Sequence, residues 1–172
     1  MNNWIQTFTG KRFTPSAPQA ELFDIRDIAH SLSMLCRYNG HCKTFYSVAE
    51  HSVRVSRVCA PDEQRWGLLH DLGEAYLGDM PRPIKTHFPL FVEIEDALLR
   101  VAAGVFDLSW PMPAGVKVAD DVLLYTEFRD LMVKLKDPYP LPQAPLPGVI
   151  IPLSPSEAEA AFLERYEEVK SR

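Results

Sequence analysis

Apolar residues recur at helical spacing along most of the chain. Between Ile25 and Cys36 they follow one another at steps of three and four residues, which places them on one face of a helix that Asn39 and Gly40 end. The pattern as a whole predicts an all-α bundle of about six helices. The same spacing predicts the other helices at residues 47–59, 62–77, 90–106, 116–136 and 154–171.

Polar residues and glycine mark where several of these helices begin and end. Ser47, followed three residues later by Glu50, is typical of a capping box, and Asp62 is a suitable N-cap for the next helix. Gly78 ends that helix, because the prolines of the following "MPRPIK" cannot continue it. Ser154 begins the last helix, with proline at the first helical position.

Two segments lack a helical pattern. We expect residues 1–23 to form an extended or irregular N-terminal arm, and residues 137–153 to form a proline-rich surface loop. The strand candidate is "GVIIPL", in which Pro152 confines a strand to a sheet edge. A chain of 172 residues is typical of one domain, and we expect residues 1–172 to form a single one.

The composition narrows the classes of partner. A net charge of −5 without a block of lysine and arginine argues against long nucleic acid as a partner. The sequence has no run of 18 apolar residues and no apolar leader at its start, so we expect neither a membrane span nor a signal peptide. Three irregularly spaced cysteines argue against a disulfide framework and favour a cytoplasmic location.

Ionisable residues interrupt the apolar stretch "LLHDLGEAYLGD". His70 stands directly beside Asp71, and such groups are unfavourable in an apolar helix unless they are paired or bound to a cation. The preceding helix carries His51, and a short connection makes the two helices antiparallel neighbours, so the two imidazoles can face each other. Glu74 lies one turn beyond the doublet, where it can accept a hydrogen bond from water on a bound metal.

A further carboxylate is needed to complete a set of four protein ligands. Asp120 and Asp121 lie in an otherwise apolar helix, and since adjacent residues do not share a face, one of them points inward and the other outward. Two imidazoles and two carboxylates suit Mn²⁺, Co²⁺, Fe²⁺, Ni²⁺ or Zn²⁺ better than Ca²⁺, and they are compatible with Mg²⁺.

These residues carry a resemblance to a known family. His51, the His70-Asp71 doublet and a late aspartate are similar to the H…HD…D signature of HD-domain metal-dependent phosphohydrolases. The stretches "AEHS", "HDLGEAYLGDMPRPIK" and "VKVADDVLLYTE" resemble most closely the HD-family 5′-deoxynucleotidases. The matched motifs span residues 37 to 130. The separation from His51 to His70 is shorter than in those enzymes, and the segment through residue 36 is not part of their pattern.

The resemblance implies a role for each matched residue. It makes His51, His70, Asp71 and Asp120 the metal ligands, with Asp120 chosen over Asp121 because the ligand follows alanine in the family. Glu74 would orient or deprotonate the attacking water, and Asp79 would act near the scissile bond as an acid or a positioning group. Arg37 would face the phosphate, and Tyr38 would crowd the nucleoside. Related enzymes are often dimers, so the resemblance is compatible with a homodimer.

The expected activity is hydrolysis of a phosphomonoester, a (deoxy)nucleoside 5′-monophosphate, with one divalent cation. Arg37 and Lys85 could hold the phosphate oxygens. Each assignment has an alternative: Arg37 as a partner of a helix C-terminus, Asp79 as a turn cap, and Lys85 as a solvated side chain. Three other functions also remain open, namely an HD hydrolase of nucleoside di- or triphosphates or alarmones, a di-iron oxygenase, and a non-catalytic metal-binding regulatory module.

Overall fold

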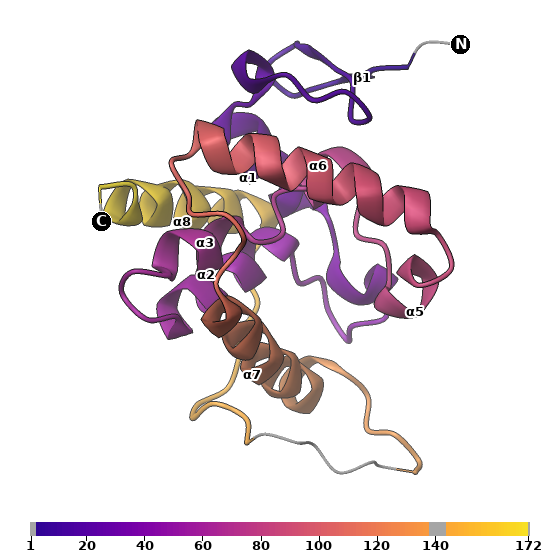
Figure 1. The fold of residues 1–172 in the computed structure, drawn as a ribbon. Coiled ribbons are helices and arrows are strands. Elements are labelled where there is room, and N and C mark those ends of the chain that lie inside the picture. The colour runs from indigo at the N-terminus through magenta and orange to yellow at the C-terminus, as the bar shows by residue number, and fades with distance from the viewer. Residues whose placement is uncertain (1–2, 138–143, 172) are drawn as a thin grey trace.

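The computed structural model describes residues 3–137 and 144–171, and most of them are helical (Figure 1). The all-α prediction is confirmed, because a small two-stranded sheet is the one sheet among these residues. None of the helices in the described ranges has the length and apolar character that a membrane crossing requires. The α-helices are α1 (Ile25–Met34), α2 (Val48–Val58), α3 (Gln64–Leu69), α4 (Glu74–Leu77), α5 (Arg82–Lys85), α6 (Pro89–Val105), α7 (Ala114–Leu131) and α8 (Pro155–Val169).

The N-terminal arm is more ordered than the sequence pattern indicates. Strands β1 (Ile5–Gln6) and β2 (Arg12–Phe13) pair antiparallel, and the 3₁₀ turn η1 (Ala20–Leu22) follows them. Phe13 is fully buried, so the hairpin is anchored to the core by a side chain of its second strand. The strand expected at residues 148–153 is wrong, because that segment forms no strand.

Helix α1 begins as expected but ends early. The Asp24 side chain accepts the backbone N–H of Arg26, which caps the helix. The helix ends at Met34, ahead of the predicted end at Asn39 and Gly40, because the chain becomes extended and Cys36 forms a β-bridge with Ser47. The 3₁₀ turn η2 (Arg37–Gly40) follows.

One half of the predicted capping box of α2 is present. The Ser47 side chain accepts the backbone N–H of Glu50 at 3.1 Å. The carboxylate of Glu50 does not return to the N-cap: Arg54 donates to it at 2.7 and 2.9 Å, and the backbone N–H of Leu153 donates at 2.8 Å. Tertiary partners therefore replace the local contact. By contrast, the capping box that begins α8 at Ser154 is complete.

The helix predicted over residues 62–77 is divided at the histidine–aspartate doublet. Glu63, not Asp62, is the N-cap of α3, which ends at Leu69, and α4 begins at Glu74. Between them the backbone N–H groups of Leu72 and Glu74 bond to carbonyls three residues back, at 3.1 and 3.0 Å. This tighter 3₁₀ winding changes the direction of the side chains that follow the doublet. Gly78, with a φ of 81°, ends α4 as predicted.

The predicted ends of the later helices differ in accuracy. Helix α6 matches the expected segment closely, and α8 ends at Val169. Helix α7 ends at Leu131, five residues before the predicted end. Part of the proline-rich loop, residues 138–143, lies outside the described residues.

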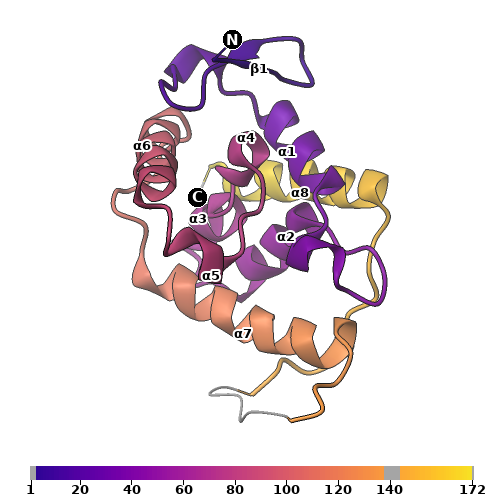
Figure 2. The same cartoon turned by 90° about the vertical axis from the view of Figure 1, so that its right-hand side faces the viewer.

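Helix α2 is central, and it packs against α1, α3, α7 and α8. Figure 2 shows α7 lying across the bundle below α2, α3 and α5. The main core is built mostly by α1, α2, α3 and α8, and buried side chains fill it. They include Ile28, Leu32, Val48, Leu68, Leu69 and Phe162. This packing directs side chains of α2, of the α3–α4 junction and of α7 into one buried region.

Candidate metal centre and its pocket

Three segments bring imidazoles and carboxylates together. His51 lies on α2, His70 and Asp71 follow α3, and Asp120 lies on α7. The rings of His51 and His70 face each other with centroids 5.3 Å apart. The Nε2 atom of His51 lies 3.3 Å from Asp120 Oδ1 and 3.7 Å from Asp71 Oδ2, and His70 Nε2 lies 3.2 Å from Asp71 Oδ2.

The imidazoles present unused nitrogens to this cluster. His70 Nδ1 donates to the backbone carbonyl of Gly67 at 2.9 Å, and His51 Nδ1 lies 2.6 Å from Glu127 Oε1. Both Nε2 atoms are buried without a hydrogen-bond partner. Ligand atoms of His51, His70 and Asp120 lie within 4.8 Å of one another. This group could hold a metal ion, because its two free nitrogens lie beside carboxylate oxygens.

The adjacent acids on α7 occupy different environments. Asp120 directs Oδ1 toward His51, while its Oδ2 accepts from Lys117 at 2.9 Å. Asp121 accepts a hydrogen bond from the same lysine and contacts neither imidazole. The structure therefore places Asp120 in the cluster and leaves Asp121 beside it.

The charges of the cluster determine the protonation of its carboxylates. Burial disfavours the charged form of Asp71, yet His70 and the other nearby cations hold the pKa of that carboxyl well below its usual range. Burial also opposes ionisation of Asp120. The hydrogen bond and the charge of His51 have the larger effect, so the pKa of Asp120 is strongly lowered. Burial lowers the pKa of His51, but neighbouring carboxylates raise it to about 9. The cluster is therefore an anionic site that attracts protons or a cation.

Glu74 has the properties of a proton acceptor. It is 8 % exposed, and its Oε2 atom is buried without a hydrogen-bond partner. Burial, followed by repulsion from Asp71 and Asp79, raises the pKa of Glu74 well above its ordinary value. A carboxylate with a raised pKa can take a proton near neutral pH, as a general base must.

A pocket of about 530 Å³ opens beside the cluster and holds the other residues expected from the sequence. Arg37, Tyr38 and Asp79 line it, and burial raises the pKa of Asp79. Arg37 Nη1 lies 3.5 Å from Asp71 Oδ2, so its guanidinium faces the cluster. Lys85 lines the pocket too, but its ammonium donates to Glu95 at 2.6 Å. In this structure Lys85 is therefore held in an ion pair with Glu95.

The turn that carries Arg37 and Tyr38 is strained. Tyr38 and Asn39 both have left-handed backbone angles, with φ of 56° and 50°. Such angles cost an L-residue roughly 1–2 kcal/mol, and asparagine tolerates them better than tyrosine. The Tyr38 hydroxyl donates to Glu127, which helps to hold the ring at the pocket wall.

Glu127 is a buried residue of this region that the sequence did not lead us to expect. It is 0 % exposed and lies two helical turns after Asp120 on α7. Burial opposes its charge, but Arg37 and His51 outweigh that penalty and lower the pKa of Glu127 to about 2. The available signal was its spacing of seven residues from Asp120, which places both carboxylates on one face of the helix.

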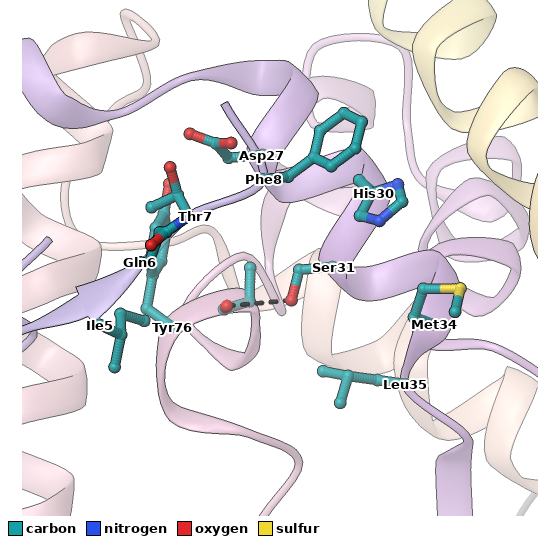
Figure 3. Close-up of a pocket in the computed structure, with 11 residues that line it drawn as sticks. Ile5, Gln6, Thr7, Phe8, Asp27, His30, Ser31, Met34, Leu35 and Tyr76 are labelled. Atoms are coloured by element: carbon teal, nitrogen blue, oxygen red, sulfur yellow. Dashed lines mark hydrogen bonds between the residues drawn. The ribbon is translucent and has the colours of Figure 1, made fainter. Parts of the chain in front are cut away.

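A second cavity, of about 390 Å³, lies between the hairpin, α1 and α4 (Figure 3). The aspartate and the histidine that line it are paired. Asp27 accepts the backbone N–H and the hydroxyl of Thr9 at 2.6 and 2.9 Å, and His30 lies 3.1 Å from Glu159. The His30 ring stacks on Phe8, with centroids 3.8 Å apart. Neither charged group of this cavity is left without a partner, in contrast to the metal-centre cluster.

Comparison with known proteins gives two relatives. The chain is 35 % identical over 171 residues to the protein YfdR of Escherichia coli (strain K12), an alignment that covers 97 % of this chain and 96 % of YfdR. It is 36 % identical over 126 residues to RCAP_rcc00048 of Rhodobacter capsulatus, covering 67 % of this chain and 64 % of that protein. Both relatives are described as uncharacterized, and no protein-family model matches the chain. On the full-length alignment, this chain belongs to the YfdR family.

Proposed function

We propose that this protein is an HD-type phosphohydrolase that cleaves a (deoxy)nucleoside 5′-monophosphate to a nucleoside and phosphate with one divalent cation. The observation that carries the proposal is the pair of buried Nε2 atoms, on His51 and His70, without partners and beside carboxylate oxygens. The ligand set would be His51, His70, Asp71 and Asp120. Its nitrogen and oxygen donors suit Mn²⁺, Co²⁺, Fe²⁺, Ni²⁺ or Zn²⁺, and they are compatible with Mg²⁺.

The surrounding residues supply the steps of hydrolysis. A divalent cation in this set would lower the pKa of water and offset charge on a phosphate oxygen. Arg37 binds phosphate oxygens, which orients the phosphorus toward Glu74. Glu74 takes the proton of the attacking water, because burial makes it a stronger base than a solvated carboxylate. Asp79, whose pKa is raised by burial, gives a proton to the departing sugar oxygen.

The walls of the pocket suit a nucleoside. Tyr38 and Phe128 lie with ring centroids 5.6 Å apart, and both line the cavity. Aromatic faces accept a nucleobase through stacking and shape, without selecting one base strongly. These contacts therefore support a nucleotide as the substrate and leave the choice of base open.

A second candidate is hydrolysis of a nucleoside di- or triphosphate or an alarmone. Arg82 Nη2 lies 3.7 Å from Asp120 Oδ2 and lines the pocket, and Lys117 Nζ lies 2.9 Å from the same oxygen. These cations lie beside Asp120, where additional phosphates would meet positive charge. A non-catalytic metal module is less well supported, because a structural site has no need of the unpartnered Glu74 beside it.

A substrate screen tests the proposal. The full-length protein is incubated with nucleoside mono-, di- and triphosphates and with each divalent ion in turn, and the released phosphate or pyrophosphate is measured. We expect phosphate release from a monophosphate that depends on the added ion and is absent in Asp71→Ala. Asp121→Asn is the matched control and should retain turnover. Release from triphosphates alone would favour the second candidate, and no release from any nucleotide would refute both.

A further inference from the structure

We propose that Glu127 is a positioning residue that fixes the metal-binding imidazole of His51 and the phosphate-facing Arg37 through the two oxygens of one carboxylate. The inference rests on the proposed metal centre and on its phosphate-binding pocket. It assigns to Glu127 no contact with substrate or metal. Its role would be exerted through the groups it holds.

The first oxygen of Glu127 faces α2. His51 Nδ1 lies 2.6 Å from Oε1, and the Tyr46 hydroxyl donates to the same atom at 2.9 Å. All three side chains are fully buried, so water does not compete for these hydrogen bonds. A hydrogen bond to an anionic carboxylate in a dry environment is stronger and more directional than one between neutral groups.

This contact determines which nitrogen of His51 is free. A carboxylate oxygen of Glu127 lies 2.6 Å from His51 Nδ1, so the contact engages this nitrogen. The Nε2 atom is then the nitrogen that faces Asp71 and Asp120, with no hydrogen-bond partner of its own. A histidine that donates one N–H to a carboxylate has a fixed ring orientation and a more basic second nitrogen.

The second oxygen of Glu127 faces the turn η2. Arg37 Nε lies 3.3 Å from Oε2, and the Tyr38 hydroxyl donates to the same atom. Arg37 Nη1 is directed to Asp71 at 3.5 Å, and the contact of Nε with Glu127 is an ion pair without hydrogen-bond geometry. The two carboxylates therefore hold the guanidinium by charge from two sides. Without Glu127, the strained Tyr38 would lose its hydrogen-bond partner, and Arg37 would lose one of its two carboxylates.

A metal-binding measurement with two variants tests the first half of the inference. Zn²⁺ affinity is measured by competition with a chelator for the wild type, for Glu127→Gln and for Thr126→Val. Thr126 is the matched control, because it is buried on α7 beside Glu127 and its hydroxyl bonds to backbone groups away from the metal centre. We expect Glu127→Gln to weaken Zn²⁺ binding roughly 10- to 100-fold and Thr126→Val to leave it unchanged. Equal affinities for Glu127→Gln and wild type would overturn this half.

Inorganic phosphate is the probe for the second half. Its affinity for the Zn²⁺-loaded protein is measured by calorimetry at saturating Zn²⁺ for each variant. Glu127→Gln should bind phosphate more weakly than Thr126→Val, because Arg37 is no longer held. Unchanged phosphate affinity would overturn the link between Glu127 and Arg37.

A measurement on the wild-type protein avoids the risk that a variant fails to fold. Nitrogen-15 NMR of the Zn²⁺-loaded chain reports which nitrogen of His51 carries a proton. We expect the proton on Nδ1, and a proton on Nε2 would overturn the inference. Zn²⁺ binding with the expected tautomer but without hydrolysis of any nucleotide would refute the proposed function and leave this inference intact.

Discussion

Two cavities share the short helix α4, and they differ in how their charged groups are satisfied. Glu74 lines the pocket beside the metal-centre cluster, while Ala75 and Tyr76 line the cavity under the hairpin. In the hairpin cavity, Asp27 and His30 both have partners within the protein. Beside the cluster, buried nitrogens of His51 and His70 and one oxygen of Glu74 have none.

The difference indicates which cavity is built for a charged ligand. A buried polar group without a partner costs about 1–3 kcal/mol, so several in one place destabilise the fold unless something binds them. In the hairpin cavity, the exception is the neutral hydroxyl of Tyr76, which is buried and has no hydrogen-bond partner. Burial raises the pKa of Tyr76 well above its ordinary value, so this group brings no charge. The unsatisfied ionisable groups are therefore concentrated at the metal centre.

The largest effect is expected for Asp71→Ala. Removal of this carboxylate takes away an oxygen beside both imidazoles, so Zn²⁺ binding and phosphate release should be lost together. Calorimetry for Zn²⁺ and a phosphate assay on the same preparation measure both. Retained turnover at full metal occupancy would remove Asp71 from the ligand set.

Asp27→Ala is the matched change in the hairpin cavity. It removes a buried carboxylate that accepts the backbone N–H and the hydroxyl of Thr9, so it should lower the free energy of unfolding by about 1–3 kcal/mol. Zn²⁺ affinity should not change. Loss of Zn²⁺ binding in this folded variant would show that the hairpin cavity supports the metal centre. It would contradict the view that only the metal-centre pocket binds a charged ligand.

The next largest effect is expected for Glu74→Gln. The amide keeps the shape of the side chain but cannot take a proton, so phosphate release should fall roughly 10²- to 10⁴-fold. Zn²⁺ affinity should remain close to that of the wild type, because Glu74, unlike Asp71, forms no ion pair with either imidazole in the described residues. If Zn²⁺ binding were lost instead, Glu74 would belong to the ligand set.

Metal removal should lower thermal stability by a smaller amount. Zn²⁺ at one hundred times its dissociation constant should stabilise the fold by about 2.7 kcal/mol. For a domain of this size, that corresponds to a rise in Tm of roughly 5–11 °C. Scanning calorimetry with Zn²⁺ and with excess EDTA measures the difference. An identical Tm for the wild type in both conditions would contradict metal binding to the native state.

The smallest effect is expected outside the metal-centre pocket, at the N-cap of α1. Hydrogen bonds from Arg26 lower the pKa of Asp24 well below its ordinary value. A lowered pKa in the folded state contributes stability above the unfolded pKa, and the contribution is lost as pH falls through the folded pKa. Asp24→Asn should therefore be slightly less stable than wild type at neutral pH, and urea titrations should show the difference shrinking below about pH 4. A difference that grew toward low pH would contradict this assignment.

Local patterns predicted the helices but not where tertiary contacts interrupt them. Helices α6 and α8 could be predicted because periodicity and capping residues are local signals. The break between α3 and α4 and the early end of α1 could not, since they depend on packing and on the bridge from Cys36 to Ser47. The hairpin was missed for the same reason, because Asp27 holds its turn through Thr9.

Some residues of the candidate site could likewise be predicted from the sequence, and others could not. The resemblance implied His51, His70, Asp71 and Asp120 as ligands. The structure places His51 beside Asp71 and Asp120, and His70 beside Asp71. The pairing of Lys85 with Glu95 could not be foreseen, because it depends on how α6 returns toward α5. The spacing of Glu127 from Asp120 places it on the same helix face but does not by itself distinguish it from a surface acid. Its role follows from the three-dimensional position of its two oxygens.

The most direct test is a crystal structure of the protein soaked with Mn²⁺, with anomalous data collected to locate the ion. The account predicts one strong anomalous peak, coordinated by Nε2 of His51 and of His70 and by carboxylate oxygens of Asp71 and Asp120. No peak at that position in crystals that bind Mn²⁺ elsewhere, or side chains turned away from a common centre, would contradict it.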